Sequence, residues 1–256
     1  MEHLGRKPKF WFIRNGERFL FKADARGTGE DWAEVIASRL CQRLGLPYVR
    51  YGLAGEWHEG VFMRHGVVCR NMAPPPLSLI LGNQLLFERD PAYPAQERYR
   101  LKQHTFQAVC DVLEELPAPA EDWLPERPDG VGTALDVFAG YVLLDALIAN
   151  QDRHHENWGI LRRDHDVWLA PTFDHGSGLA RGITDPEREE RLTTKDRNRN
   201  LEAYTAKARS AIFAAANDRK AIGTFELFER FANRSPTAAG VWQNRVAEIH
   251  AKNSKI

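Results

Sequence analysis

Two short runs near the start of the chain are rich in aromatic and aliphatic residues, and in the second run Phe19 and Phe21 alternate with Leu20 and Lys22. The runs are residues 9–13 (KFWFI) and 18–23 (RFLFKA), with Asn15 and Gly16 between them. Alternation is typical of β-strands, and Asn-Gly between two such runs indicates a tight hairpin. The pattern therefore predicts a two-stranded hairpin with Lys22 near the end of its second strand.

Apolar residues recur at intervals of three and four over 32–44, which predicts an amphipathic helix. Its expected buried face consists of Trp32, Val35, Ile36, Leu40 and Leu44. Gly45 is expected to end this helix. Residues 48–53 and 60–64 are further strand candidates, which would complete a small sheet beside the hairpin.

The stretch 133–150 carries the clearest helical pattern of the chain. Thr133 is expected to cap its start, with Asp136 three residues later as in a capping box. Because so much of this helix is apolar, it should lie at the centre of the protein. Less regular patterns predict a helix over 96–116 and further core helices over 201–250.

Three consecutive prolines, at positions 74–76, interrupt these patterns. We therefore expect two lobes: residues 1–73, with the sheet and one helix, and residues 74–256, which are mainly helical. The charge-dense run 185–199 is expected to be a solvated loop or an exposed helix.

Two short apolar runs, 158–161 and 167–170, predict a second hairpin, and polar residues flank it on both sides. Asp152 and Asn157 precede the hairpin, and Asp174 follows it. Since a hairpin returns the chain to its starting point, we expect these three side chains to lie close together.

This trio suits phosphoryl transfer. Magnesium takes oxygen ligands, often only one or two of them from the protein, so Asn157 and Asp174 are candidate ligands. Asp152 is the candidate base that accepts the proton of an attacking hydroxyl. Lys22 would bind phosphate oxygens from the other lobe.

Composition narrows the function further. The 256 residues include 35 basic and 35 acidic ones, so overall charge gives no reason to expect direct nucleic-acid binding. Three scattered cysteines without a Cys-x-x-Cys pair argue against a disulfide framework and fit a reducing compartment. No run approaches the length of a membrane span, so we expect a cytoplasmic protein.

The polar segment resembles the catalytic loop and metal-binding segment of the HipA-like kinases, a bacterial branch of the protein-kinase-like fold. In that family an Asp-Arg-His-x-x-Asn motif is followed by a strand pair and an Ala-Pro-x-x-Asp segment. Here these motifs are residues 152–157 (DRHHEN) and 170–174 (APTFD). In the N-terminal part, residues 5–9 (GRKPK) resemble the family's phosphate-side loop, Lys22 its strand lysine and Glu34 its helix glutamate.

The resemblance implies an α+β protein with a two-lobed protein-kinase-like fold, a small antiparallel sheet in the first lobe and helices in the second. It implies ATP and magnesium as cofactors, and phosphorylation of Ser or Thr on a protein, including the chain itself. The implied residues are Asp152, Arg153 and His154 for catalysis, Asn157 and Asp174 for magnesium, and Lys22, Glu34, Lys7 and Lys9 for ATP. Asp152 would be the base, while Arg153 and His154 would organise its loop.

Several alternatives stay open at this point. The chain has no G-x-G-x-x-G loop, and Asp-His-Gly stands where ordinary protein kinases have Asp-Phe-Gly. A small-molecule or phosphoinositide kinase of the same fold would use the same loop, and an ATP-binding module without catalysis would keep the fold. A metal-dependent phosphohydrolase would need histidines that converge on a metal, drawn from His154, His155, His165 and His175. An antitoxin-like protein partner is conceivable from the resemblance, and Glu30 rivals Glu34 as the partner of Lys22.

Overall fold

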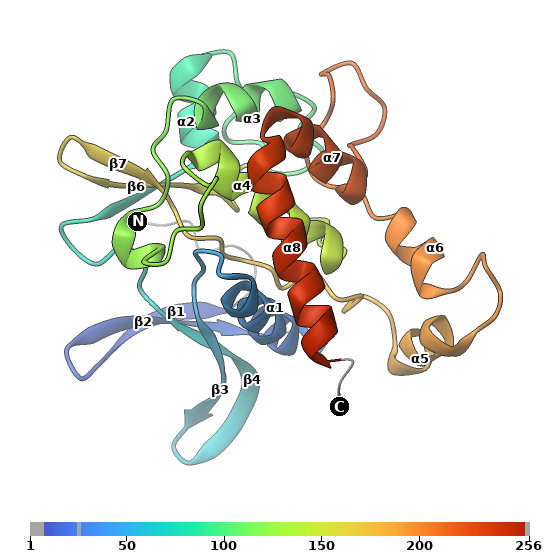
Figure 1. The fold of residues 1–256 in the computed structure, drawn as a ribbon. Coiled ribbons are helices and arrows are strands. Elements are labelled where there is room, and N and C mark those ends of the chain that lie inside the picture. Colours follow the sequence, from blue (N-terminus) through green and yellow to red (C-terminus); the bar gives the residue numbers. More distant parts are fainter. Residues whose placement is uncertain (1–7, 25–26, 254–256) are drawn as a thin grey trace.

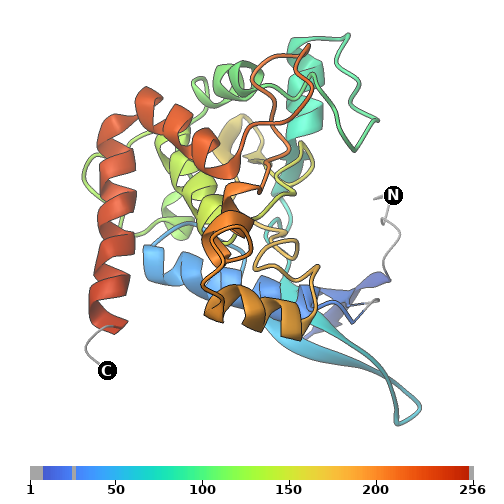
Figure 2. The ribbon, with the colours of Figure 1, turned by 90° about the vertical axis from the view of Figure 1, so that its right-hand side faces the viewer.

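The computed structural model describes residues 8–24 and 27–253, and Lys7 lies outside these residues. A four-stranded antiparallel sheet, in the order β1-β2-β4-β3, forms the N-terminal part (Figure 1). Its strands are β1 (Lys9–Arg14), β2 (Glu17–Ala23), β3 (Tyr51–His58) and β4 (Val61–Arg70). The β3–β4 hairpin projects from the rest of the molecule (Figure 2).

The first predicted hairpin is confirmed. Asn15 and Gly16 form its turn with φ values of +53° and +78°, as a two-residue turn of this kind requires. β2 is a central strand, and Lys22 lies opposite Val67 of β4. The later strands were predicted over 48–53 and 60–64, but β3 begins and ends later than predicted, and β4 extends to Arg70. Residues 64–70 have no regular alternation that would mark them as β-strand.

Helix α1 (Glu30–Leu44) is confirmed, but its predicted buried face is only partly right: Leu44 is buried, and Val35 and Leu40 are half-buried against the two cores. Ile36 is 43% exposed, whereas the inward face carries mostly small side chains together with Glu34. Those buried residues are Glu30, Ala33, Glu34, Ala37, Ser38, Cys41 and Leu44. The small side chains let the helix contact the sheet on one side and the later helices on the other.

A second sheet, in the order β5-β6-β7, follows the proline run. Its β6 (Gly159–Arg163) and β7 (Asp166–Leu169) are the second predicted hairpin, and β5 (Ser78–Leu81) was not predicted. The predicted helix over 96–116 is wrong in its first half. Only α3 (Phe106–Leu113) forms there, because Thr105 accepts a hydrogen bond from the Ala108 amide and caps the helix start.

Helix α4 (Ala134–Leu147) is the centre of the helical part, as predicted. Thr133 and Asp136 form the expected capping box. Phe138 contacts Phe231, and the Trp242 indole donates to the Asp136 carbonyl at 2.8 Å. The other helical elements are α2 (Gly82–Arg89), the short η1 (Glu121–Trp123), α5 (Asp185–Thr193), α6 (Leu201–Ala206), α7 (Thr224–Arg234) and α8 (Pro236–Asn253).

Helix α5 has no buried residue, which agrees with the expectation for the charge-dense run. No helix in the described part of the chain is long and apolar enough to cross a membrane. The main core joins α1 to α4, α7 and α8. The division into lobes at residues 73 and 74 stays a prediction, and this shared core crosses it.

A smaller core positions the predicted site. Phe173 packs with Val49, Tyr51 and Val67, which lie on or beside the N-terminal sheet. The neighbouring Asp174 is thereby held beside Lys22, near the end of β2. Two segments about 150 residues apart in the sequence meet at this point.

Candidate active site

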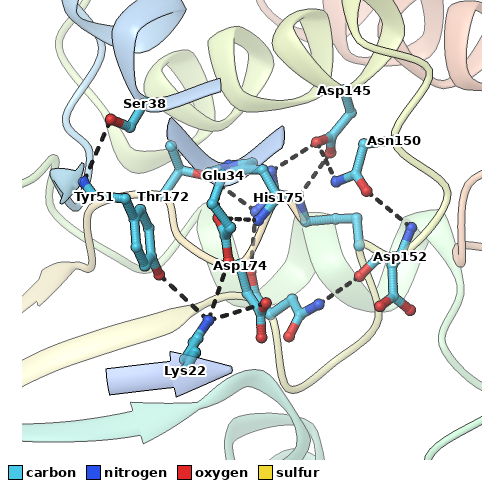
Figure 3. Close-up of polar contacts among 12 residues, drawn as sticks. Lys22, Glu34, Ser38, Tyr51, Asp145, Asn150, Asp152, Thr172, Asp174 and His175 are labelled. Atoms are coloured by element: carbon cyan, nitrogen blue, oxygen red, sulfur yellow. Dashed lines mark hydrogen bonds and ion pairs between the residues drawn. The ribbon is translucent and has the colours of Figure 1, made fainter. Parts of the chain in front are cut away.

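Lys22 lies at the centre of a cluster of charges (Figure 3). Its Nζ is 3.2 Å from Glu34 Oε1 and 3.1 Å from Asp174 Oδ1. Tyr51 OH lies 3.5 Å from the same nitrogen. The Lys22 side chain is 21% exposed and that of Glu34 only 3%, so the pair is largely shielded from solvent.

The charges around Lys22 keep its ammonium and the Asp174 carboxylate ionised. Burial disfavours the Lys22 ammonium, but Asp174, Tyr51 and Glu34 outweigh it and hold the lysine pKa well above its ordinary value. Burial also opposes ionisation of Asp174, yet Lys22 holds the pKa of that carboxyl well below its usual range. Burial raises the pKa of Glu34 to about 7, against the pull of Lys22.

The structure separates the two glutamates that the sequence left as rivals. Glu34 contacts Lys22, whereas Glu30 pairs with Arg181 at 2.7 Å. Both glutamates therefore tie α1 to the segment around Asp174, because the Glu34 Oε2 also accepts from the His175 amide at 2.9 Å. Arg181 was not predicted from the sequence.

Arg153 is a buried anchor of the polar loop. Its guanidinium binds Asp145 through two hydrogen bonds of 2.7 and 2.8 Å, and donates to the Asn157 carbonyl and to Thr172 Oγ1. A bidentate pair of this kind fixes both position and orientation. Arg153 thus holds the loop and the segment before Asp174 together, and it lies among protein groups rather than facing an open site.

A continuous polar network links this anchor to the Lys22 cluster. Thr172 Oγ1 accepts from Arg153, so its own hydrogen points to His175 Nε2, 2.8 Å away. The imidazole then carries its hydrogen on Nδ1, which faces Glu34 Oε2 at 4.0 Å. Burial, with Arg153 acting in the same direction, holds the His175 pKa well below its ordinary value, so the ring is neutral.

Asp152 lies on the other side of the loop, and its side chain is 39% exposed. Its Oδ2 accepts from the Ser177 hydroxyl at 3.3 Å, and its amide donates to Asn150 Oδ1. In Figure 3 its carboxylate and that of Asp174 point to the same side of the loop. Arg181 donates to the Ser177 hydroxyl at 3.4 Å, so the chain Glu30–Arg181–Ser177 connects α1 to Asp152.

Asn157 is buried and oriented by its neighbours. Its Nδ2 donates to the Asp152 carbonyl at 2.7 Å, which leaves the side-chain oxygen as the atom that a cation would meet. Asp174 adopts a left-handed conformation with φ of +60°, which is uncommon outside glycine and clusters at functional sites. One ionised carboxylate and one amide oxygen fit magnesium, which takes its remaining ligands from phosphate and water.

The histidines do not form a common group. His154 Nε2 accepts from Arg98 at 3.4 Å, while His155 contacts the Tyr93 hydroxyl. His175 points toward Glu34, and His165 lies in the exposed turn between β6 and β7. Within residues 8–24 and 27–253, no group of three or more His, Cys, Asp or Glu side chains is placed to hold a metal ion.

Lys9, a predicted ATP contact, lies opposite Lys22 in the β1–β2 pair, as the predicted hairpin implied.

Other site residues had little or no sign in the sequence. Asp145 interrupts an otherwise apolar helix, which marks a buried charge with a partner. Thr172, Ser177 and Arg181 gave no such sign.

No family model and no curated protein matches this chain. Solved structures do match it. The crystal structure of the proinflammatory kinase CtkA from Helicobacter pylori aligns with a TM-score of 0.60 and 17% identity, over 94% of this chain and 89% of that one. HipA of Shewanella oneidensis, in complex with HipB and operator DNA, aligns with a TM-score of 0.50 and 13% identity, over 96% of this chain and 59% of that one.

The chain has the fold of these kinases. The HipA-like, kinase-type architecture predicted from the sequence is therefore confirmed. Since the identities are low, the likeness concerns the fold, and the roles of the individual residues come from their own geometry.

Proposed function

We propose that this protein is an ATP- and magnesium-dependent phosphotransferase that phosphorylates Ser or Thr of a protein, including its own chain. The observation that carries the proposal is Lys22, which lies within 3.2 Å of both Glu34 and Asp174. A lysine held by a helix glutamate beside an ionised aspartate is what protein kinases use to bind Mg·ATP. The kinase-type fold adds independent support.

Each side chain has a defined part in this reaction. Mg·ATP supplies the phosphoryl group, together with the metal charge that stabilises its transfer. Lys22 binds phosphate oxygens, and Glu34 keeps its ammonium in place. Asp174 and Asn157 hold magnesium. Asp152 accepts the proton from the acceptor hydroxyl.

The remaining residues support these roles. Arg153 fixes the loop through Asp145, and His154, which burial and Arg98 keep neutral with a pKa of about 4, fills the space beside Asp152. Lys9 and Lys7 are proposed as further ATP contacts from the first strand and the residues before it. A serine hydroxyl of the chain itself, Ser177, already donates to Asp152, which supports a hydroxyl as the acceptor.

The test is phosphate transfer from γ-labelled ATP in the presence of magnesium, with intact-mass detection. Asp152→Asn should reduce transfer by about 100-fold or more, because the base is lost, and should spare nucleotide binding. Asp174→Asn should also weaken magnesium-dependent ATP binding. Asp122→Asn, an exposed aspartate of η1, is the matched control. Unchanged turnover in Asp152→Asn would refute the assignment of the base.

The same assay separates the alternatives. Label on small molecules or lipids alone would assign a metabolite or phosphoinositide kinase, and ATP binding without any transfer would assign a non-catalytic module. The proposal places the protein in the cytoplasm, where ATP is available. Its three cysteines, all buried and free, suit that compartment.

An antitoxin-like partner is part of the proposal. The S. oneidensis HipA structure includes HipB and operator DNA, although this chain spans only 59% of HipA. Purification of the untagged protein from its native cells, with light scattering and mass spectrometry, would detect a stoichiometric partner. A protein that elutes alone at its monomer mass would count against one.

A further inference from the structure

A cavity of about 530 Å³ lies beside Asp152, apart from the Lys22 cluster. Asp152, His154 and His155 form one wall. Two other segments, within residues 98–104 and 209–221, form the remaining walls. Its volume is in the usual range of small-ligand sites.

Hydrogen bonds between these two segments fix the shape of the cavity, although the segments are over 100 residues apart in sequence. The Phe213 amide donates to the His104 carbonyl at 2.9 Å, and the Phe106 amide donates to the Phe213 carbonyl at 2.8 Å. His104 Nδ1 donates to the Ala211 carbonyl at 3.0 Å. The walls are therefore held against each other by backbone and buried side-chain contacts.

The charge of the cavity is strongly one-sided. One carboxylate lines it, that of Asp152, against six basic side chains: Arg98, Arg100, Lys102, Arg209, Arg219 and Lys220. Arg98 is paired with Glu156 at 2.9 Å. The other five are exposed and have no ion-pair partner within the described residues. The chain as a whole has a net charge of zero, so this positive charge is a local feature.

We propose that this cavity is the acceptor site and selects a hydroxyl that is flanked by anionic groups, either carboxylates or phosphates. The inference rests on the proposed function, because it takes Asp152 as the base. Five uncompensated cations around one hollow attract and orient an anion, and guanidinium groups bind carboxylate and phosphate with particular geometric fit. A hydroxyl brought to Asp152 would therefore belong to a molecule that carries negative charge next to it.

The test compares three fluorescent peptides: a serine flanked on both sides by aspartates, the same peptide with asparagines, and the same peptide with lysines. Binding is measured by anisotropy, without ATP, and transfer is measured with Mg·ATP. The aspartate peptide should bind and react best. Arg219→Gln/Lys220→Gln should weaken its binding about tenfold, because two of the five free cations are lost.

The matched control is Arg50→Gln/Arg162→Gln, which removes two exposed basic side chains outside the cavity. It should leave binding of the aspartate peptide unchanged. Equal binding of the three peptides, or equal losses in the two double variants, would overturn the inference.

Further arms identify the source of the negative charge. A peptide with phosphoserine beside the acceptor serine, and soluble sugar and inositol phosphates, are offered with Mg·ATP. Faster phosphate transfer to one of these acceptors supports the inference and identifies the acceptor class, provided that Arg219→Gln/Lys220→Gln reduces this transfer and Arg50→Gln/Arg162→Gln does not. Anisotropy measures binding without catalysis. Binding of the aspartate peptide without any phosphate transfer would therefore contradict the proposed function but still support an anion-selective acceptor cavity. Mg·ATP binding, followed by thermal shift, reports on the nucleotide site separately.

Discussion

Thr172 illustrates how much of the site depends on one hydroxyl. It accepts from Arg153 and donates to His175, so it joins the loop anchor to the residue that follows Asp174. The neutral imidazole in turn faces Glu34, the partner of Lys22. A single buried oxygen thus sets both a tautomer and the orientation of the charges around the lysine.

Thr172→Val removes this hydroxyl and keeps the side-chain shape. Arg153 loses one acceptor and His175 loses its donor, both in a buried setting. We expect a loss of about 1–3 kcal/mol in the free energy of unfolding, measured by urea denaturation. Thr172→Ser keeps the hydroxyl and is the control. Equal stability of the valine and serine variants would show that the network contributes nothing to folding.

At the scale of elements, β4 approaches β2 closely at Gly66. A β-carbon at this position would lie 2.3 Å from the Lys22 carbonyl oxygen and 3.0 Å from Ala23 Cα. Both contacts are with backbone, which cannot rotate away. The absence of a side chain at 66 therefore fixes the path of the strand that carries Lys22.

Gly66→Ala should push β2 and β4 apart at Lys22. We expect a loss of about 2 kcal/mol or more in unfolding free energy, together with weaker Mg·ATP binding as Lys22 moves. Gly52→Ala, in β3, is the matched control, because a β-carbon at this position would have no atom within 4 Å. It should leave stability unchanged or raise it slightly. Equal urea midpoints for the two alanine variants would contradict this role of Gly66.

The first hairpin, the second hairpin and α4 were predictable because their patterns are local: Asn15-Gly16 sets one turn, and Thr133 caps a long apolar run. The buried face of α1 was not fully predictable in this way. Glu34 is buried there only because Lys22 and the His175 amide, 12 and 141 residues away, compensate its charge. Long-range compensation of this kind leaves no trace in periodicity.

The candidate site follows the same rule. The spacing of Asp152, Asn157 and Asp174 around a hairpin was visible in the sequence, because the hairpin itself brings them together. The basic cavity was not visible, since its walls come from segments without regular structure, 98–104 and 209–221. The balanced overall charge concealed it as well.

At the scale of the whole molecule, four buried histidines link stability to pH, since burial also holds the pKa of His175 well below its ordinary value. Burial lowers the pKa of His104 to about 3, and burial together with weaker contributions lowers those of His154 and His155 to about 4. His104 shows the cause directly. Its Nδ1 donates to the Ala211 carbonyl and its Nε2 accepts from the Trp158 indole, so a second proton would face a donor.

These shifts predict acid unfolding that begins above the range of carboxylates. Below pH 6.5 the unfolded chain binds protons at these histidines and the folded protein does not, so stability falls as pH falls from 6.5 towards 4. Each histidine contributes up to about 1.4 kcal/mol per pH unit in that window. Glu34, with its pKa raised to about 7, acts in the opposite sense, but it is one group against four. Urea unfolding from pH 7.5 to 4.5 measures the slope.

His104→Gln tests the origin of this slope. The glutamine amide can donate to the Ala211 carbonyl and accept from Trp158, but it does not titrate, so the slope should fall by the share of one histidine. His165→Gln, in the exposed turn between β6 and β7, is the control and should keep the full slope. A slope that is unchanged in His104→Gln would show that His104 does not contribute to the loss of stability in acid, although its imidazole is buried between the Ala211 carbonyl and the Trp158 indole.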